Sequence, residues 1–243
     1  MSLNQSAEEN LRIIRSLMER TSTYRSISVP SATGAGIVSV AAFLFNLWLI
    51  QAGHLYFSFK GFLLLWLGVL VLAAIGNTVI LYREARRAGT TFPSPAMISA
   101  ISGMAPAFLA AGVLTGVIAY FDVSLTGGIS CIDINRPEIF KVSYIVVPFW
   151  MLFYGIGLLG TQHFAPRSII VLGWAFVLSS LFTLITTPFW VGIFFMEMRT
   201  QGNLTFYLPS AIMAATFGGY HLLYATLVSR SNRHQKALTA AQP

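Results

Sequence analysis

The chain has 243 residues, of which 56% are hydrophobic and only 9% are charged, with a formal net charge of +7. Soluble globular domains carry roughly 25% charged residues, so this composition excludes that class and indicates a membrane protein. The basic residues lie beside apolar runs, which argues against nucleic-acid binding and indicates that they orient the chain in a bilayer.

Residues 1–31 form a polar N-terminal segment without the pattern of a secretory signal. Within it, Leu11, Ile14, Leu17 and Met18 fall on one face of a predicted helix. We expect a cytoplasmic amphipathic helix, which either lies on the inner leaflet or docks a partner, or packs on its own bundle.

Six apolar runs follow, and each is long enough to cross the ~30 Å hydrocarbon core as a helix. They cover residues 34–51, 61–82, 96–121, 139–160, 168–196 and 205–228. The sequence therefore predicts an all-α, polytopic membrane protein with a six-helix transmembrane domain over residues 32–229. Residues 230–243 form a basic cytoplasmic tail.

Lysine and arginine are concentrated on one side of the predicted bundle. Eleven lie on the side of the two termini, and four, namely Lys60, Arg136, Lys141 and Arg199, lie on the other. Because cytoplasmic flanks collect positive charge, both termini are predicted to be cytoplasmic. An even number of spans agrees with this orientation.

The sixth run carries small residues at helical spacing. Ser210, Ala214 and Gly218 repeat at i, i+4 and i+8, which lets helix backbones approach closely in lipid. His221 lies on the same face and is expected to point into the bundle. A polar group is costly in hydrocarbon unless it is paired, so an inward histidine is a candidate functional residue.

Other polar residues lie at a similar depth, as judged from the ~1.5 Å rise per helical residue. The predicted cluster, a candidate ligand or proton site, consists of Asn77, Ser99, Ser102, Tyr154, His221 and Tyr224. The alternative is that these residues only make interhelical hydrogen bonds, worth on the order of 0.6 kcal/mol each.

No cofactor or metal is assigned from the sequence. A transmembrane haem usually takes two facing histidines, whereas His221 is the only histidine within a predicted span. His163 lies in the loop after the fourth run, at the predicted cytoplasmic edge. A copper site would require His54, Cys131, Met196 and Met198 to converge, and their spacing matches no known site. No catalytic motif is present, so we do not predict an enzyme.

Two short stretches carry a resemblance. RSLMERTSTYRSIS at residues 15–28 and FGGYHLLYA at residues 217–225 resemble uncharacterised bacterial multi-spanning integral membrane proteins with a short N-terminal amphipathic helix. The resemblance implies a bacterial inner-membrane location and no activity. It makes Arg20 and His221 the first residues to test.

Three functions remain open. The leading hypothesis is a non-enzymatic accessory or sensory subunit of a larger membrane assembly, which associates with a membrane-protein partner or with itself. The second is a small transporter or channel-like carrier, gated by His221 and opened by kinks at Pro106, Pro148 and Pro188. The third is a membrane redox component that binds haem or quinone near His221 and Tyr224.

Overall fold

The computed structural model describes residues 28–52, 59–126, 138–163, 165–201 and 204–240, and the regular elements in these ranges are helices. In chain order they are α2 Val29–Gln51, α3 Phe59–Ala88, α4 Pro95–Thr126, α5 Glu138–Leu159, α6 Arg167–Gln201, α7 Leu204–Met213, the π-helix η1 Ala214–Tyr220 and α8 His221–Ala240. Since α7, η1 and α8 follow one another without a break, the described chain folds as six helices. Each predicted apolar run coincides with one of them.

Five of these helices are long and apolar enough to cross a bilayer. The qualifying segments are Val29–Leu49, Gly61–Ala88, Met97–Tyr120, Arg167–Thr187 and Tyr207–His234. In α5 the apolar part that the structure describes, Ile145–Leu159, is shorter. The prediction of an all-α, multi-pass membrane protein is therefore confirmed, whereas a sixth crossing and the orientation stay predictions.

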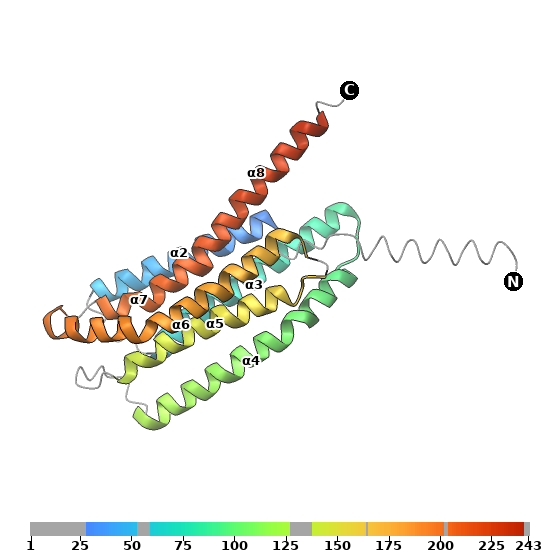
Figure 1. Cartoon of the computed structure of the whole chain (residues 1–243). Coiled ribbons are helices and arrows are strands. Elements are labelled where there is room, and N and C mark those ends of the chain that lie inside the picture. Colours follow the sequence, from blue (N-terminus) through green and yellow to red (C-terminus); the bar gives the residue numbers. More distant parts are fainter. Residues whose placement is uncertain (1–27, 53–58, 127–137, 164, 202–203, 241–243) are drawn as a thin grey trace, which may run out of the picture.

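The helices lie side by side in an elongated bundle, and consecutive helices run in opposite directions (Figure 1). The central pair is α5 and α6, which pack along each other. On one side α4 packs on α5, and on the other α2 packs on α3 and on the continuous α7–η1–α8 helix. The C-terminal part of α8 extends beyond the bundle (Figure 1).

Three helix contacts are made by pairs of glycines. Gly36 meets Gly218 between α2 and η1, Gly155 meets Gly173 between α5 and α6, and Gly103 meets Gly160 between α4 and the end of α5. A Cβ added at Gly155 would lie 2.8 Å from the carbonyl oxygen of Gly173, closer than side chains are found to approach. These backbones can touch because neither partner carries a side chain.

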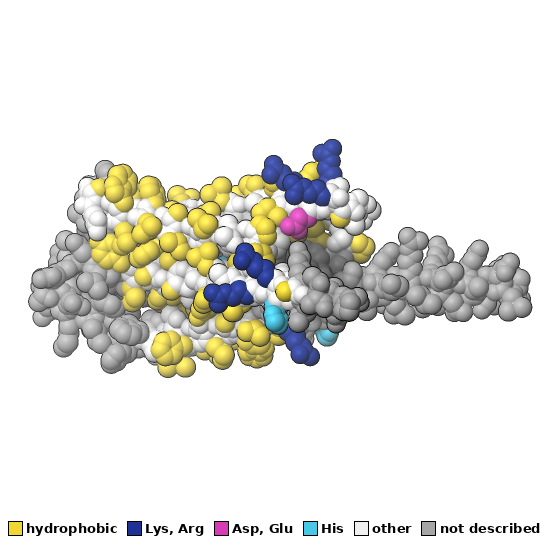
Figure 2. Space-filling view, turned by 90° about the horizontal axis from the view of Figure 1, so that it is seen from above, with side chains coloured by type: hydrophobic (Ala, Val, Ile, Leu, Met, Phe, Trp, Pro, Cys, Tyr) yellow, Lys and Arg dark blue, Asp and Glu magenta, His cyan; other side chains and the backbone are white. Residues whose placement is uncertain are grey.

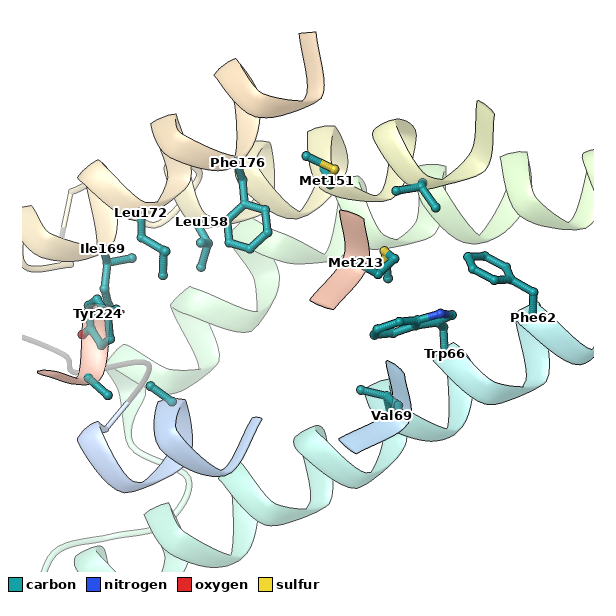
Figure 3. Close-up of a cluster of buried hydrophobic side chains, with 14 residues drawn as sticks. Phe62, Trp66, Val69, Met151, Leu158, Ile169, Leu172, Phe176, Met213 and Tyr224 are labelled. Carbon is teal, nitrogen blue, oxygen red and sulfur yellow. The ribbon is translucent and has the colours of Figure 1, made fainter. Parts of the chain in front are cut away.

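Apolar side chains fill the interior of the bundle and also cover its outside. Phe62, Trp66, Met151 and Phe176 are among the buried side chains that converge between the helices (Figure 3). On the outer surface, apolar side chains cover the body of the molecule (Figure 2). An apolar surface of this extent would be unfavourable in water, and a bilayer accounts for it because lipid replaces water around the helices.

Polar side chains connect neighbouring helices inside this apolar body. The indole Nε1 of Trp150 on α5 donates to Thr115 Oγ1 on α4 at 2.8 Å. The hydroxyl of Ser180 on α6 donates to the backbone carbonyl of Pro148 on α5 at 2.7 Å. Buried polar groups are costly unless paired, so these bonds fix which faces of the helices meet.

Some sequence-based predictions fall outside the described part of the chain. They are the amphipathic face within residues 1–27, His54 and Cys131, and the side chains of Met196, Met198 and Pro188. These stay predictions.

Candidate functional site

The most specific polar contact inside the bundle joins two predicted site residues, Tyr154 on α5 and His221 at the start of α8. The Tyr154 hydroxyl lies 2.8 Å from Nε2 of His221, and Nδ1 of the same ring lies 2.7 Å from the carbonyl oxygen of Phe217. Because a carbonyl oxygen can only accept, Nδ1 carries the proton and donates to it. In the neutral imidazole Nε2 is then the acceptor, and the Tyr154 hydroxyl donates to it.

The imidazole follows directly on the π-helix η1. The backbone N–H of His221 donates to the carbonyl oxygen of Gly218, so the Phe217 carbonyl one residue earlier is available to the side chain of His221. π-Helices are rare and occur frequently at functional sites. Here η1 and the two hydrogen bonds together fix the position of His221.

An aromatic cluster surrounds the pair. The Tyr154 ring contacts Phe176 edge-on, with ring centroids 4.8 Å apart, and Phe217 at 5.1 Å. Phe176 is fully buried and also contacts the His221 ring at 5.9 Å. Phe176 also contacts Tyr220, whose hydroxyl shares a hydrogen bond with the hydroxyl of Ser179 on α6. Consecutive residues of the α7–η1–α8 helix, Tyr220 and His221, therefore bind α6 and α5 respectively.

The chemistry of the pair follows from these contacts. Both ring nitrogens of His221 are engaged, so a metal or haem iron at Nε2 would have to displace the Tyr154 hydroxyl. Within the described residues no three His, Cys, Asp or Glu side chains lie close enough to hold a metal ion. His163 is exposed beyond the end of α5. What the pair can do as it stands is hold a hydrogen-bonded proton between two helices.

Three of the remaining members of the predicted cluster, Ser99, Ser102 and Asn77, do not join this pair through a described hydrogen bond. Tyr224 is buried one turn after His221 and belongs to the apolar core. Ser99 and Ser102 lie exposed on α4, and the Ser102 hydroxyl donates to the Ser99 carbonyl within its own helix. Asn77 is half-buried on α3, and its Oδ1 has no hydrogen-bond partner among the described residues.

The predicted packing residues of the sixth run lie in the contact with α2. Ser210 is fully buried, Ala214 is 8% exposed, and a Cβ added at Gly218 would lie 3.0 Å from Val40 on α2. Sequence reasoning missed their partner Asn46, whose Nδ2 donates to Ser210 Oγ at 2.8 Å. Asn46 could have been identified from the sequence, because it is an amide in the middle of an apolar run.

A second missed feature lies on the outer face of α4. Gly112 and Gly116 form a G-x-x-x-G pattern, and nothing lies within 4 Å of a Cβ added at either position. Leu109 and Val113 share this face and are 69% and 67% exposed. We call these four residues the α4 glycine face. The glycine spacing is visible in the sequence and could have been found there.

No protein-family model, curated protein or solved structure matches the chain at a significant level, so no family is identified. The resemblance of the two short stretches to bacterial membrane proteins gains no support from these comparisons. The structure supports a helical protein with five long apolar helices.

Proposed function

We propose that the protein is a non-enzymatic accessory subunit of a larger membrane assembly and that it associates through the α4 glycine face. The observation that carries the proposal is the contrast between the glycines. Six of them form tight contacts between helices of the same chain, whereas Gly112 and Gly116 have the same small size and face open space. In lipid, helices associate through close backbone approach, and the G-x-x-x-G pattern permits it.

The attachment of α4 supports this proposal. It packs chiefly on α5, through Gly103 and the Trp150–Thr115 hydrogen bond, on the face opposite Leu109 and Val113. Its glycine face is therefore available to a transmembrane helix of a partner or of a second copy. No hydrophobic force drives that association within lipid, so packing at the small residues is what would favour it.

The proposal includes a topology with six crossings and both termini in the cytoplasm of a bacterial cell. The helix α5 runs beside α6 and supplies the sixth crossing (Figure 1). Six of the described arginines lie toward one end of the bundle, namely Arg83, Arg86 and Arg87 at the end of α3, Arg167 at the start of α6, and Arg230 and Arg233 on α8, whereas Arg199 lies at the other end of α6. The preference of cytoplasmic flanks for positive charge supports this orientation.

The experiment compares two matched pairs of substitutions. The variant Gly112→Leu/Gly116→Leu fills the α4 glycine face, and Gly68→Leu/Gly76→Leu fills equally open positions on α3. A Cβ at any of these four positions meets no described atom within 4 Å, so we expect both variants to retain the fold. After mild-detergent purification, native mass measurement should show at least tenfold less associated protein with the α4 variant than with wild type. The α3 variant should show no such loss. A monomeric wild-type protein that copurifies with nothing would refute the proposal.

A carrier with a gate at His221 is the second candidate, and the Tyr154–His221 hydrogen bond beside the π-helix favours it. Breaking one bond there would release α8 from α5. The flux measured in proteoliposomes at pH 5.5 and 7.5 should then differ between wild type and Tyr154→Phe. If the flux of His221→Ala equalled that of wild type at both pH values, His221 would not be the gate of a carrier.

A further inference from the structure

The three arginines at the end of α3 form a separate charged surface. Arg83, Arg86 and Arg87 are all exposed in the last turns of the helix. Their spacing of i, i+3 and i+4 places the three side chains on one helical face. We call them the α3 arginine face. Three guanidinium groups so close together repel one another unless an anion lies among them.

The sequence of side chains along α3 locates this face at the edge of the membrane. Val79 is 41% exposed and Tyr82 is 47% exposed, and the arginines begin at the next residue. The Tyr82 ring packs edge-on against Phe92 with centroids 5.5 Å apart. Apolar, then aromatic, then basic side chains are the order in which a helix leaves hydrocarbon and enters the headgroup layer.

None of these guanidinium groups is neutralised by another part of the chain that the structure describes. No ion pair or hydrogen bond joins any of the three side chains to a described residue, and the neighbouring Glu84 is itself exposed without such a pair. The basic side chains gather toward one end of the apolar body (Figure 2). An anion that binds these arginines would therefore come from outside the described chain.

We propose that the α3 arginine face binds the phosphate of an anionic phospholipid headgroup. Guanidinium groups form paired hydrogen bonds with phosphate oxygens, whereas a lysine ammonium offers only a point charge. A phospholipid satisfies both halves of the surface, since its acyl chains lie along Val79 and its phosphate reaches the arginines. This inference is independent of association through the α4 glycine face.

The test uses the full-length protein, purified and exposed to an equimolar mixture of phosphatidylglycerol and phosphatidylcholine. Native mass spectrometry then counts each bound lipid. Wild type should retain phosphatidylglycerol over phosphatidylcholine by at least fivefold. The variant Arg83→Gln/Arg86→Gln/Arg87→Gln should reduce that preference to about one. The corresponding triple lysine variant keeps the charge and should fall between the two.

A charge-matched control removes three positive charges at the same end of the bundle, from the α8 segment. The variant Arg230→Gln/Arg233→Gln/Lys236→Gln should keep most of the preference, because it leaves the α3 arginine face intact. If both glutamine variants lost the preference equally, net charge and not this face would be responsible, and the proposal would fail. It would also fail if wild type showed no preference, or if an acidic polypeptide or nucleic acid occupied the face instead.

Thermal unfolding separates lipid binding from a structural role of the arginines at the C-terminal end of α3, where positive charge also favours the helix. If the arginines act through lipid, phosphatidylglycerol should raise the unfolding temperature of wild type and not that of the triple glutamine variant. A purely structural role predicts that the variant is less stable by the same amount in both lipids. That outcome would overturn the proposal.

Discussion

Glycines occur both inside this bundle and on its outer surface, but their contacts differ between the two regions. Around α5, α6 and η1, glycines bring backbones into contact and buried polar side chains join one helix to the next. On the outer faces of α3 and α4, a Cβ added at a glycine meets no atom of the described chain within 4 Å, and large apolar side chains are exposed. Small residues permit close helix contacts, and among these outer glycines Gly112 and Gly116 on α4 have the G-x-x-x-G spacing that suits a contact with another chain.

The largest expected effect is at an inner glycine. In Gly155→Ala the new Cβ would lie 2.8 Å from both the Gly173 carbonyl oxygen and Val177 Cγ2, so α5 and α6 must separate. We expect a loss of ~1–3 kcal/mol of stability from this overpacking. Thermal unfolding in detergent measures it, at roughly 2–4 °C per kcal/mol for a chain of this size. An unchanged unfolding temperature would mean that the α5–α6 contact is looser than described.

A smaller effect is expected when the polar contact between α5 and α8 is removed. Tyr154→Phe keeps the aromatic cluster and removes the hydroxyl that donates to His221 Nε2, leaving a buried acceptor without its partner. The expected loss is about 1 kcal/mol. The control is Tyr82→Phe, which alters a half-exposed ring and should leave stability unchanged. Equal losses in both variants would contradict the role given to Tyr154.

The smallest effect is expected at an outer glycine. Gly112→Ala introduces a Cβ that meets nothing within 4 Å, and alanine favours a helix over glycine. The unfolding temperature of the monomer should stay the same or rise slightly. A fall comparable to that of Gly155→Ala would abolish the distinction between inner and outer glycines.

The helices themselves could be predicted from the sequence because length and apolarity are local properties. Each run of apolar residues corresponds to one helix, and the small-residue face of the sixth run lies against α2. The π-helix could not be predicted, since η1 has the same apolar and small residues as an ordinary helix. Its geometry depends on the neighbours that hold it.

The candidate site could be predicted only in part, for a reason that Ser102 and Tyr154 illustrate. The rise per residue gives the depth of a side chain and says nothing of which helices are neighbours. Tyr154 and His221 share a depth and lie on adjacent helices, so they meet. Ser102 lies on α4, which packs chiefly on α5, and its side chain is exposed. Asn46 meets Ser210, about three turns before His221, and so lies at a different depth from the predicted cluster.

The central claim is that the α4 glycine face is covered by another protein helix. Photocrosslinking in native membranes tests it most directly, with a photoreactive residue at Leu109 on that face and, in a second variant, at Leu72 on α3. Both positions are exposed, at 69% and 60%. We predict a discrete protein adduct from position 109 and lipid adducts alone from position 72. Lipid adducts alone from both positions would contradict the account.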